Sequence, residues 1–150
     1  MKYYQKVKIK NIDFDKAKLA FHKYDFIKYL TKFQPVKILK WDGIENGNTA
    51  HFKFWFFGWR QIIVSHKNYL NSKNKLSFTD YSKVCLPLGL SLWKHKHILK
   101  KDKNFIYIED HFEFDHRYKF FTYLLYPIMI MPILIRKITY KSFFKYNKTI

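Results

Sequence analysis

The chain has little of what several familiar kinds of site require. Its 150 residues include a single cysteine, Cys85, so no disulfide forms within the chain, and this composition fits a reducing compartment. With only 4 glycines, it has no glycine-rich phosphate loop and no Gly-x-Ser-x-Gly nucleophile turn. Residues 1–10 lack the apolar block of a signal peptide. We therefore expect a cytoplasmic protein without these nucleotide or hydrolase motifs.

Acidic residues and arginine are also scarce. Lys and Arg number 29 against 11 Asp and Glu, for a net charge of +18, and lysine supplies almost all of the positive charge. Lysine is poorer than arginine at bidentate recognition of phosphates and bases, and the basic residues are scattered along the chain. We interpret the charge as a solvated lysine surface and expect no specific nucleic-acid binding. An anionic membrane surface stays as the alternative anionic partner.

Hydrophobic residues make up 48% of the chain and aromatic residues 21%, which predicts one domain, 1–150, around one core. Asp13 or Asp15 is expected to cap a short helix that ends at Phe21, and Asp25 to cap a second helix over 26–33. Alternating apolar residues predict antiparallel strands, which we place at 2–9, 36–41, 49–57, 59–69, 76–84 and in the two arms of a hairpin, 91–114.

The hairpin over 91–114 carries the most informative pattern. Both arms alternate, and a polar run at 100–104 separates them, so one face is mainly aromatic and aliphatic and the other mostly charged. The predicted inner-face pairs are Trp93 with Phe112, His95 with Asp110, and His97 with Ile108. Two histidines and an aspartate on an apolar face are unusual, because buried polar groups need partners.

The C-terminal segment changes to a helical period. Residues 120–135 carry no charge, and a lysine stripe follows at 137, 141 and 145. Pro127 suits a first helical turn, whereas Pro132 predicts a kink or a later start. The uncharged run has 16 residues and falls short of the roughly 20 that span a membrane. We expect burial against the sheet, with contact at a membrane surface as the first alternative and a true span as the second.

Element order and motif together resemble a known superfamily. The motifs are Trp93-Lys94-His95-Lys96-His97, the strand Asp110–Phe114, and Phe78-Thr79-Asp80 upstream. The chain resembles the START-type or SRPBCC superfamily, which includes polyketide cyclases, lipid-transfer domains, plant pollen allergens and bacterial ligand-binding proteins. The resemblance implies an α+β helix-grip fold. In this fold a curved antiparallel sheet of about seven strands wraps around a long C-terminal helix, and two short helices follow the first strand.

The resemblance also implies a cavity between sheet and helix that binds a hydrophobic or amphipathic small molecule, such as a lipid, quinone or polyketide. We expect the pair His95–Asp110 to act as a structural network, as a polar ligand anchor, or as the acid and base of a cyclase or dehydratase. No cofactor is expected. A metal site is not expected either, because no third ligand accompanies His95 and His97. Oligomeric state is left open. The candidate lining residues are Trp93, His95, His97, Asp110, Phe112, Ile108, Phe54, Trp59, Phe78, Met131 and Ile135.

Overall fold

The computed structural model describes residues 1–82, 86–103 and 105–147. Alternating segments up to residue 116 give the strands, with two short helices after the first strand, and helical periodicity over 119–146 gives one long helix. The elements in order are β1 (Lys2–Ile9), α1 (Phe14–Phe21), α2 (Tyr24–Thr31), β2 (Val36–Trp41), β3 (Thr49–Trp55), β4 (Trp59–Asn71), β5 (Lys75–Ser82), the short 3-10 helix η1 (Pro87–Gly89), β6 (Leu90–Asp102), β7 (Phe105–His116) and α3 (Lys119–Tyr146).

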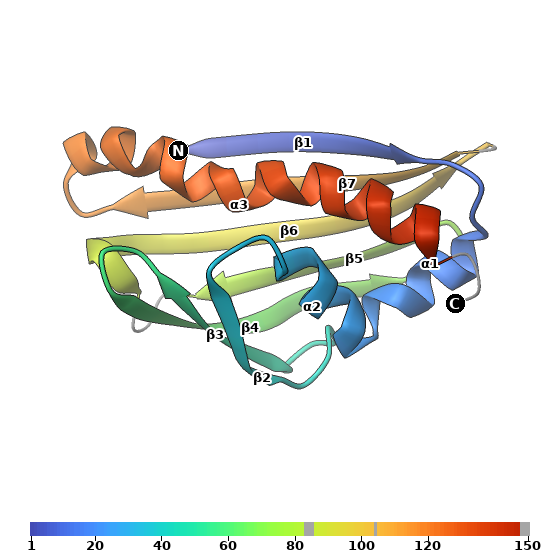
Figure 1. Cartoon of the computed structure of the whole chain (residues 1–150), viewed down its shortest axis with the longest axis horizontal. Helices are drawn as coiled ribbons and strands as arrows, with labels where there is room; N and C mark the ends of the chain where they lie inside the picture. The colour runs from blue at the N-terminus through green and yellow to red at the C-terminus, as the bar shows by residue number, and fades with distance from the viewer. Residues whose placement is uncertain (83–85, 104, 148–150) are drawn as a thin grey trace.

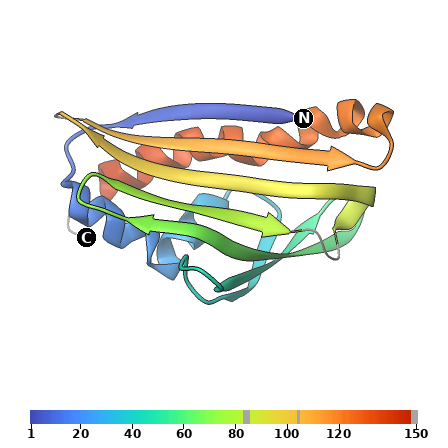
Figure 2. The ribbon, with the colours of Figure 1, turned by 180° about the vertical axis from the view of Figure 1, so that it is seen from behind.

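All seven strands form one antiparallel sheet in the order β1-β7-β6-β5-β4-β3-β2. Consecutive strands are neighbours from β2 to β7, and β1 closes the sheet on β7. Irregular pairing interrupts β2–β3, β4–β5 and β6–β7, and such bulges bend and twist strands. Figure 2 shows the sheet from behind, with α3 on its far side. The expected α+β architecture is confirmed.

The helices cover one face of this sheet. α3 runs along that face, while α1 and α2 connect the edge strands β1 and β2 beside the C-terminal half of α3 (Figure 1). Phe26 of α2 packs on Phe143 and Phe144 of α3, with ring centroids 4.8 and 5.6 Å apart. Tyr29 Oη and Ser142 Oγ are hydrogen-bonded at 2.6 Å. The main core therefore lies between these three helices and the sheet.

α3 begins earlier than the sequence predicts. It starts at Lys119, eight residues before Pro127, so both Pro127 and Pro132 lie inside the helix. A proline ring in a helix removes one backbone hydrogen bond, but the helix continues through both positions to Tyr146. Among the described residues, α3 is the one helix long and apolar enough to cross a membrane by length and composition, and 22% of its most apolar window is buried.

The hairpin differs from its predicted register by two residues. His95 pairs with Phe112 and His97 with Asp110, because β6 continues through Lys101 to Asp102, which pairs directly with Phe105. The polar run was predicted to be a longer turn. A shift of two residues leaves every side chain on its predicted face, and His95, His97 and Asp110 are all buried as expected.

The remaining boundaries differ by a few residues. Asp13 caps α1 as predicted and accepts from the backbone amides of Asp15 and Lys16. Asp25 is not the cap of α2, because the helix covers Tyr24–Thr31 and so begins and ends two residues earlier than predicted, with Lys23 at its N-cap. β3 ends at Trp55, two residues before the predicted end, and β4 continues two residues further to Asn71. Cys85, like the predicted strand end at Val84, lies outside the described residues.

Candidate functional site

A row of polar side chains crosses the inner face of the sheet on five adjacent strands. Strand pairing sets Gln5 of β1 beside Asp110 of β7, and Asp110 beside His97 of β6. On the other side, Asp80 of β5 pairs with His95 of β6 and with His66 of β4. Inward-facing positions at matching register explain why these residues meet. We call Gln5, His66, Asp80, His95, His97 and Asp110 the polar row.

Asp110 is the centre of this row and is fully buried. Its Oδ1 lies 3.0 Å from His95 Nε2 and 3.1 Å from His97 Nδ1, and Tyr140 Oη donates to the same oxygen at 3.2 Å. Gln5 Nε2 donates to Oδ2 at 2.9 Å. Burial alone would raise the pKa of Asp110, but the two histidines outweigh it and hold the pKa well below its ordinary value. Asp110 is therefore a buried carboxylate.

His97 lies between two carboxylates. Its Nδ1 contacts Asp110, and its Nε2 is 3.2 Å from Asp80 Oδ2. Ionised carboxylates only accept hydrogen bonds, so both ring nitrogens of His97 must donate, as they do in the protonated imidazolium. Burial lowers the pKa of His97, yet the charges of Asp80 and Asp110 more than offset this and raise it. His97 is the cation that holds the two acids together.

His95 has the opposite electrostatic environment. It is buried, its ring centroid is 4.0 Å from that of His97, and it contacts a single carboxylate. Burial, followed by repulsion from His97, lowers the pKa of His95 to about 4. The ring is neutral at pH 7 and donates its Nε2 hydrogen to Asp110, which leaves the lone pair on Nδ1. The predicted contact between His95 and Asp110 is therefore present.

Two residues of α3 complete the cluster, and the sequence-based candidates did not include them. Tyr140 is fully buried, and burial together with the charge of Asp110 raises its pKa well above the ordinary value. Arg136 lies one helical turn earlier, and its Nε is buried without a hydrogen-bond partner. Met129, Ile133, Arg136 and Tyr140 follow the spacing of one helix face. This spacing was the signal that an arginine was turned toward the sheet.

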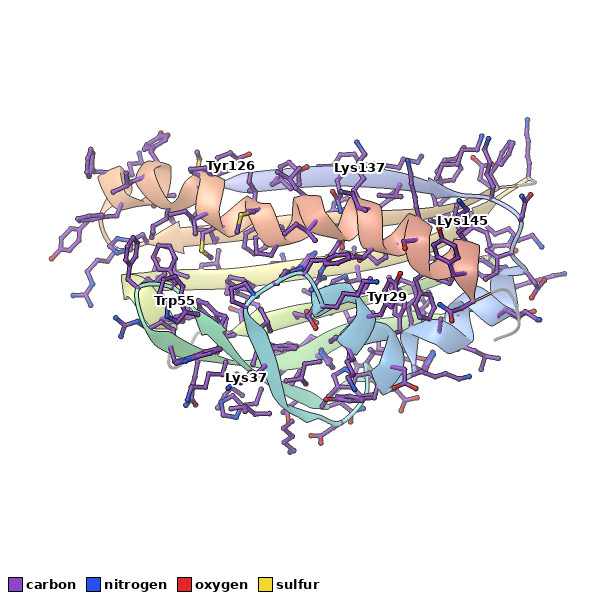
Figure 3. All side chains as sticks on the ribbon, in the orientation of Figure 1. Tyr29, Lys37, Trp55, Tyr126, Lys137 and Lys145 are labelled. Atoms are coloured by element: carbon purple, nitrogen blue, oxygen red, sulfur yellow. The ribbon has the colours of Figure 1, made fainter. Side chains whose placement is uncertain are left out.

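A cavity of about 180 Å³ adjoins the polar row. Its walls come from α3, from the connection between α2 and β2, and from β3, β4 and β6, and are mostly apolar. Of the candidate residues, Trp93, His95, Phe54, Met131 and Ile135 line it, together with Asp80 and Arg136. Phe33, Trp55 and Met131 are exposed lining residues and mark the mouth. Figure 3 places Trp55 toward the same end of the molecule as Tyr126 of α3.

The other candidate residues lie elsewhere. His97 and Phe78 line a separate cavity of about 30 Å³, which also borders His66, Asp80 and Arg136 and has room for one or two water molecules. Ile108, Asp110 and Phe112 are buried on the inner face but line neither cavity. Trp59 was expected at the cavity and is instead 43% exposed. Its position directly after the β3–β4 turn puts it at an end of the sheet.

The structure also adds a third residue to the two histidines that were considered as metal ligands. Ligand atoms of Asp80, His95 and His97 all lie within 4.8 Å of one another. A tetrahedral zinc site would take three such ligands and a water. In the observed arrangement, however, both nitrogens of His97 face carboxylates, so the geometry is that of a hydrogen-bonded ion cluster.

Comparison with known proteins was informative only at the level of structure. No protein-family model matches the sequence, and no curated protein matches it either. Fifty-two solved chains match in structure. The architecture is the helix-grip fold of START-type and SRPBCC proteins, with the seven-stranded antiparallel sheet and long C-terminal helix described above.

Three of these solved structures illustrate the likeness. A hypothetical protein from Helicobacter pylori has a TM-score of 0.67 at 13% identity, with 95% of this chain and 87% of that chain covered. Norcoclaurine synthase from Thalictrum flavum, in complex with dopamine and hydroxybenzaldehyde, has a TM-score of 0.63 at 13% identity, covering 100% and 89%. Human STARD10 has a TM-score of 0.57 at 10% identity, covering 97% and 66%. Identities this low establish a shared fold.

Proposed function

We propose that this protein binds a hydrophobic or amphipathic small molecule in the cavity between α3 and the sheet. The observation that carries the proposal is the cavity of about 180 Å³ itself, with apolar walls and a polar end formed by Asp80, His95 and Arg136. Ligand sites commonly combine a mostly apolar lining with a few convergent polar groups. Norcoclaurine synthase, which shares the fold, is described in complex with two aromatic molecules. Lipids, quinones and polyketide-like aromatics are the candidate ligand classes.

Native mass spectrometry of gently purified protein, followed by titration of delipidated protein with fatty acids, quinones and aromatic polyketides, tests this proposal. We expect either a co-purified ligand or a titrant that raises the melting temperature, because a ligand bound to the native state stabilises it. The cavity-filling variant Val64→Phe should abolish the effect, since Val64 is buried and lines the cavity. Ile63→Phe, on the exposed face of the same strand, is the matched control. Absence of any bound species and of any shift would overturn the proposal.

Acid–base catalysis by His95 is the second candidate, of the cyclase or dehydratase type. His95 lines the cavity, is neutral, and is oriented by Asp110. A base with a pKa near 4 is weak at neutral pH, however, because catalysis is most efficient when the pKa lies near the working pH. Binding is thus the better-supported function. A cyclase activity would be recognised by turnover that is lost in His95→Ala while ligand affinity survives.

We also propose a contact with an anionic membrane surface. It would involve the end of the molecule where α3 begins and the β3–β4 turn lies, which we call the open end (Figure 1). Large apolar side chains are exposed on both elements: Phe120 and Tyr123 of α3 are 71% and 62% exposed, and Phe57 of the turn is 82% exposed. Stable attachment needs an apolar and a basic contribution together, and the net charge of +18 supplies the second. Liposome flotation with and without anionic lipid tests this, with Phe57→Ser and Phe120→Ser as variants. Equal recovery of wild type and variants with both liposome types would refute it.

A further inference from the structure

Arg136 is the cation at the polar end of the large cavity. No lysine lines that cavity among the described residues, so the guanidinium and the neutral His95 are its basic groups. Arg136 belongs to the inward face of α3, between Ile133 and Tyr140, both of which are buried. The apolar helix thus turns one permanently charged group toward the ligand space.

This guanidinium has spare hydrogen-bonding capacity. Tyr140 is its side-chain hydrogen-bond partner, but its Nε is buried and has no partner. The nearby acids are engaged elsewhere, because Asp110 accepts from four side chains and Asp80 contacts His66 and His97. A buried polar atom without a partner calls for an explanation, and a ligand acceptor is one that the adjoining cavity can supply.

The surrounding charges permit an anion. Two carboxylates, Asp80 and Asp110, stand against two cations, His97 and Arg136, so the cluster is balanced before a ligand enters. His97 lies between the two acids and offsets part of their negative charge. The guanidinium presents a planar fork of donors that matches a carboxylate in bidentate fashion. A hydroxyl or ketone would use only part of that fork.

We propose that the ligand is a hydrophobic carboxylic acid, with its carboxylate bound by Arg136 and its apolar body between Trp93, Phe54 and Met129. This inference rests on the proposed binding function and specifies its ligand class. A cavity of about 180 Å³ is close to the ~150 Å³ apolar cavity that accommodates a benzene ring. A single-ring aromatic acid therefore fits inside, and an aliphatic acid with a longer tail extends through the mouth beside Phe33 and Met131.

Isothermal titration at pH 7 with a matched pair of probes, 3-phenylpropionate and the uncharged 3-phenylpropan-1-ol, tests the inference. A hydrogen bond to a charged group contributes about 1.5–3 kcal/mol, so we expect wild type to bind the acid roughly 10-fold or more tighter than the alcohol. Arg136→Met should remove this preference and leave alcohol binding within about 3-fold, whereas Arg136→Lys should retain part of it because the charge remains. Arg60→Gln changes an exposed residue of β4; it is the control for net charge and should behave as wild type.

The possible outcomes distinguish the carboxylate assignment from the binding function on which it rests. Equal affinity of wild type for acid and alcohol overturns the carboxylate assignment and leaves ligand binding intact. Binding of neither probe, nor of any ligand in the broader titration, overturns the binding function itself. A merely structural Arg136 predicts a lower melting temperature in Arg136→Met with an unchanged ratio of acid to alcohol affinity. Where Arg136→Met does not fold, the wild-type ratio and Arg136→Lys decide the question.

Discussion

The two halves of α3 lie in very different surroundings. The C-terminal half is enclosed by α1, α2 and the sheet, and its Tyr140, Phe143 and Phe144 are buried (Figure 1). The N-terminal half exposes Phe120 and Tyr123 and forms one wall of the large cavity further along. One amphipathic helix thus closes the core at one end and leaves apolar surface open at the other. The polar row and Arg136 lie where these two environments meet.

The largest contrast should be between truncating an aromatic residue of α2 that packs on the C-terminal half of α3 and truncating an exposed aromatic residue of the N-terminal half. Phe26→Ala removes a side chain that is 3% exposed and contacts Phe21, Phe143 and Phe144, so it should cost about 3–5 kcal/mol of unfolding free energy. Phe120→Ala at the open end should change stability by less than about 0.5 kcal/mol. Urea denaturation measures both. Comparable losses in the two variants would mean that the open end is part of the folding core.

Removal of the Asp110 charge should come next in size. Asp110→Asn keeps the shape of the side chain but leaves His97 with Asp80 as its remaining carboxylate, and it forces an amide NH₂ group toward donors. Breaking a buried ion pair on one side costs about 3 kcal/mol or more. The control is Asp102→Asn at the exposed end of β6, which should be neutral in the same denaturation assay. A stable Asp110→Asn variant that retains ligand affinity would show that the Asp110 charge is needed neither for stability nor for ligand binding.

The register of β6 and β7 marks the limit of what alternation can predict. Alternating residues correctly assigned the faces of His95, His97 and Asp110, because a side-chain period of two separates inside from outside. The same period cannot distinguish two registers that differ by two residues. The choice depended on where the turn lies, and Lys101 and Asp102 are polar residues that pair as strand. The fold was therefore predictable from sequence, whereas the particular cross-strand neighbours were not.

The polar cluster contains more residues than the sequence predicted. These additional contacts depend on how strands pair and how α3 docks on the sheet. Asp80 belongs to the motif Phe78-Thr79-Asp80, but its contact with His97 depends on the pairing of β5 with β6. Arg136 and Tyr140 come from α3, whose docking angle no sequence pattern specifies. Trp59 illustrates the opposite error, because aromatic character alone suggested a cavity wall and the residue is exposed. Contacts between elements distant in sequence carry the information that the pattern lacks.

Acid should lower the stability of the folded protein through His95, which lies where the two halves of α3 meet. The unfolded chain takes up a proton at its ordinary pKa of 6.5, whereas folded His95 does so only near 4. Stability therefore falls as pH decreases between these values, by about 2 kcal/mol from pH 7 to pH 4.5 at ~1.4 kcal/mol per pKa unit. His97 acts in the opposite direction, because its raised pKa gives stability that is fully present below the ordinary value of 6.5 and is lost as pH rises through the folded value.

Urea midpoints measured from pH 7 to pH 4.5 report the acid effect. The variant His95→Gln keeps an N–H donor for Asp110 and should have a much flatter pH profile than wild type. Asp80 and Asp110, whose pKa values are lowered, lose their contribution only as pH falls below about 4, outside this window. Parallel profiles for wild type and variant would assign the acid sensitivity to other groups.

Zinc should have the smallest effect on stability, even though three candidate ligands lie close together in the polar row. To bind Zn²⁺, His97 would have to lose a proton and a hydrogen bond to Asp80 or Asp110, and a dication would lie close to Arg136. We therefore expect equimolar Zn²⁺ or EDTA to shift the melting temperature by less than about 1 °C, since a ligand stabilises only in proportion to its affinity for the native state. A rise of several degrees that disappears in His97→Gln and in Asp80→Asn would instead identify the cluster as a metal centre, because those changes remove ligands without opening the cavity.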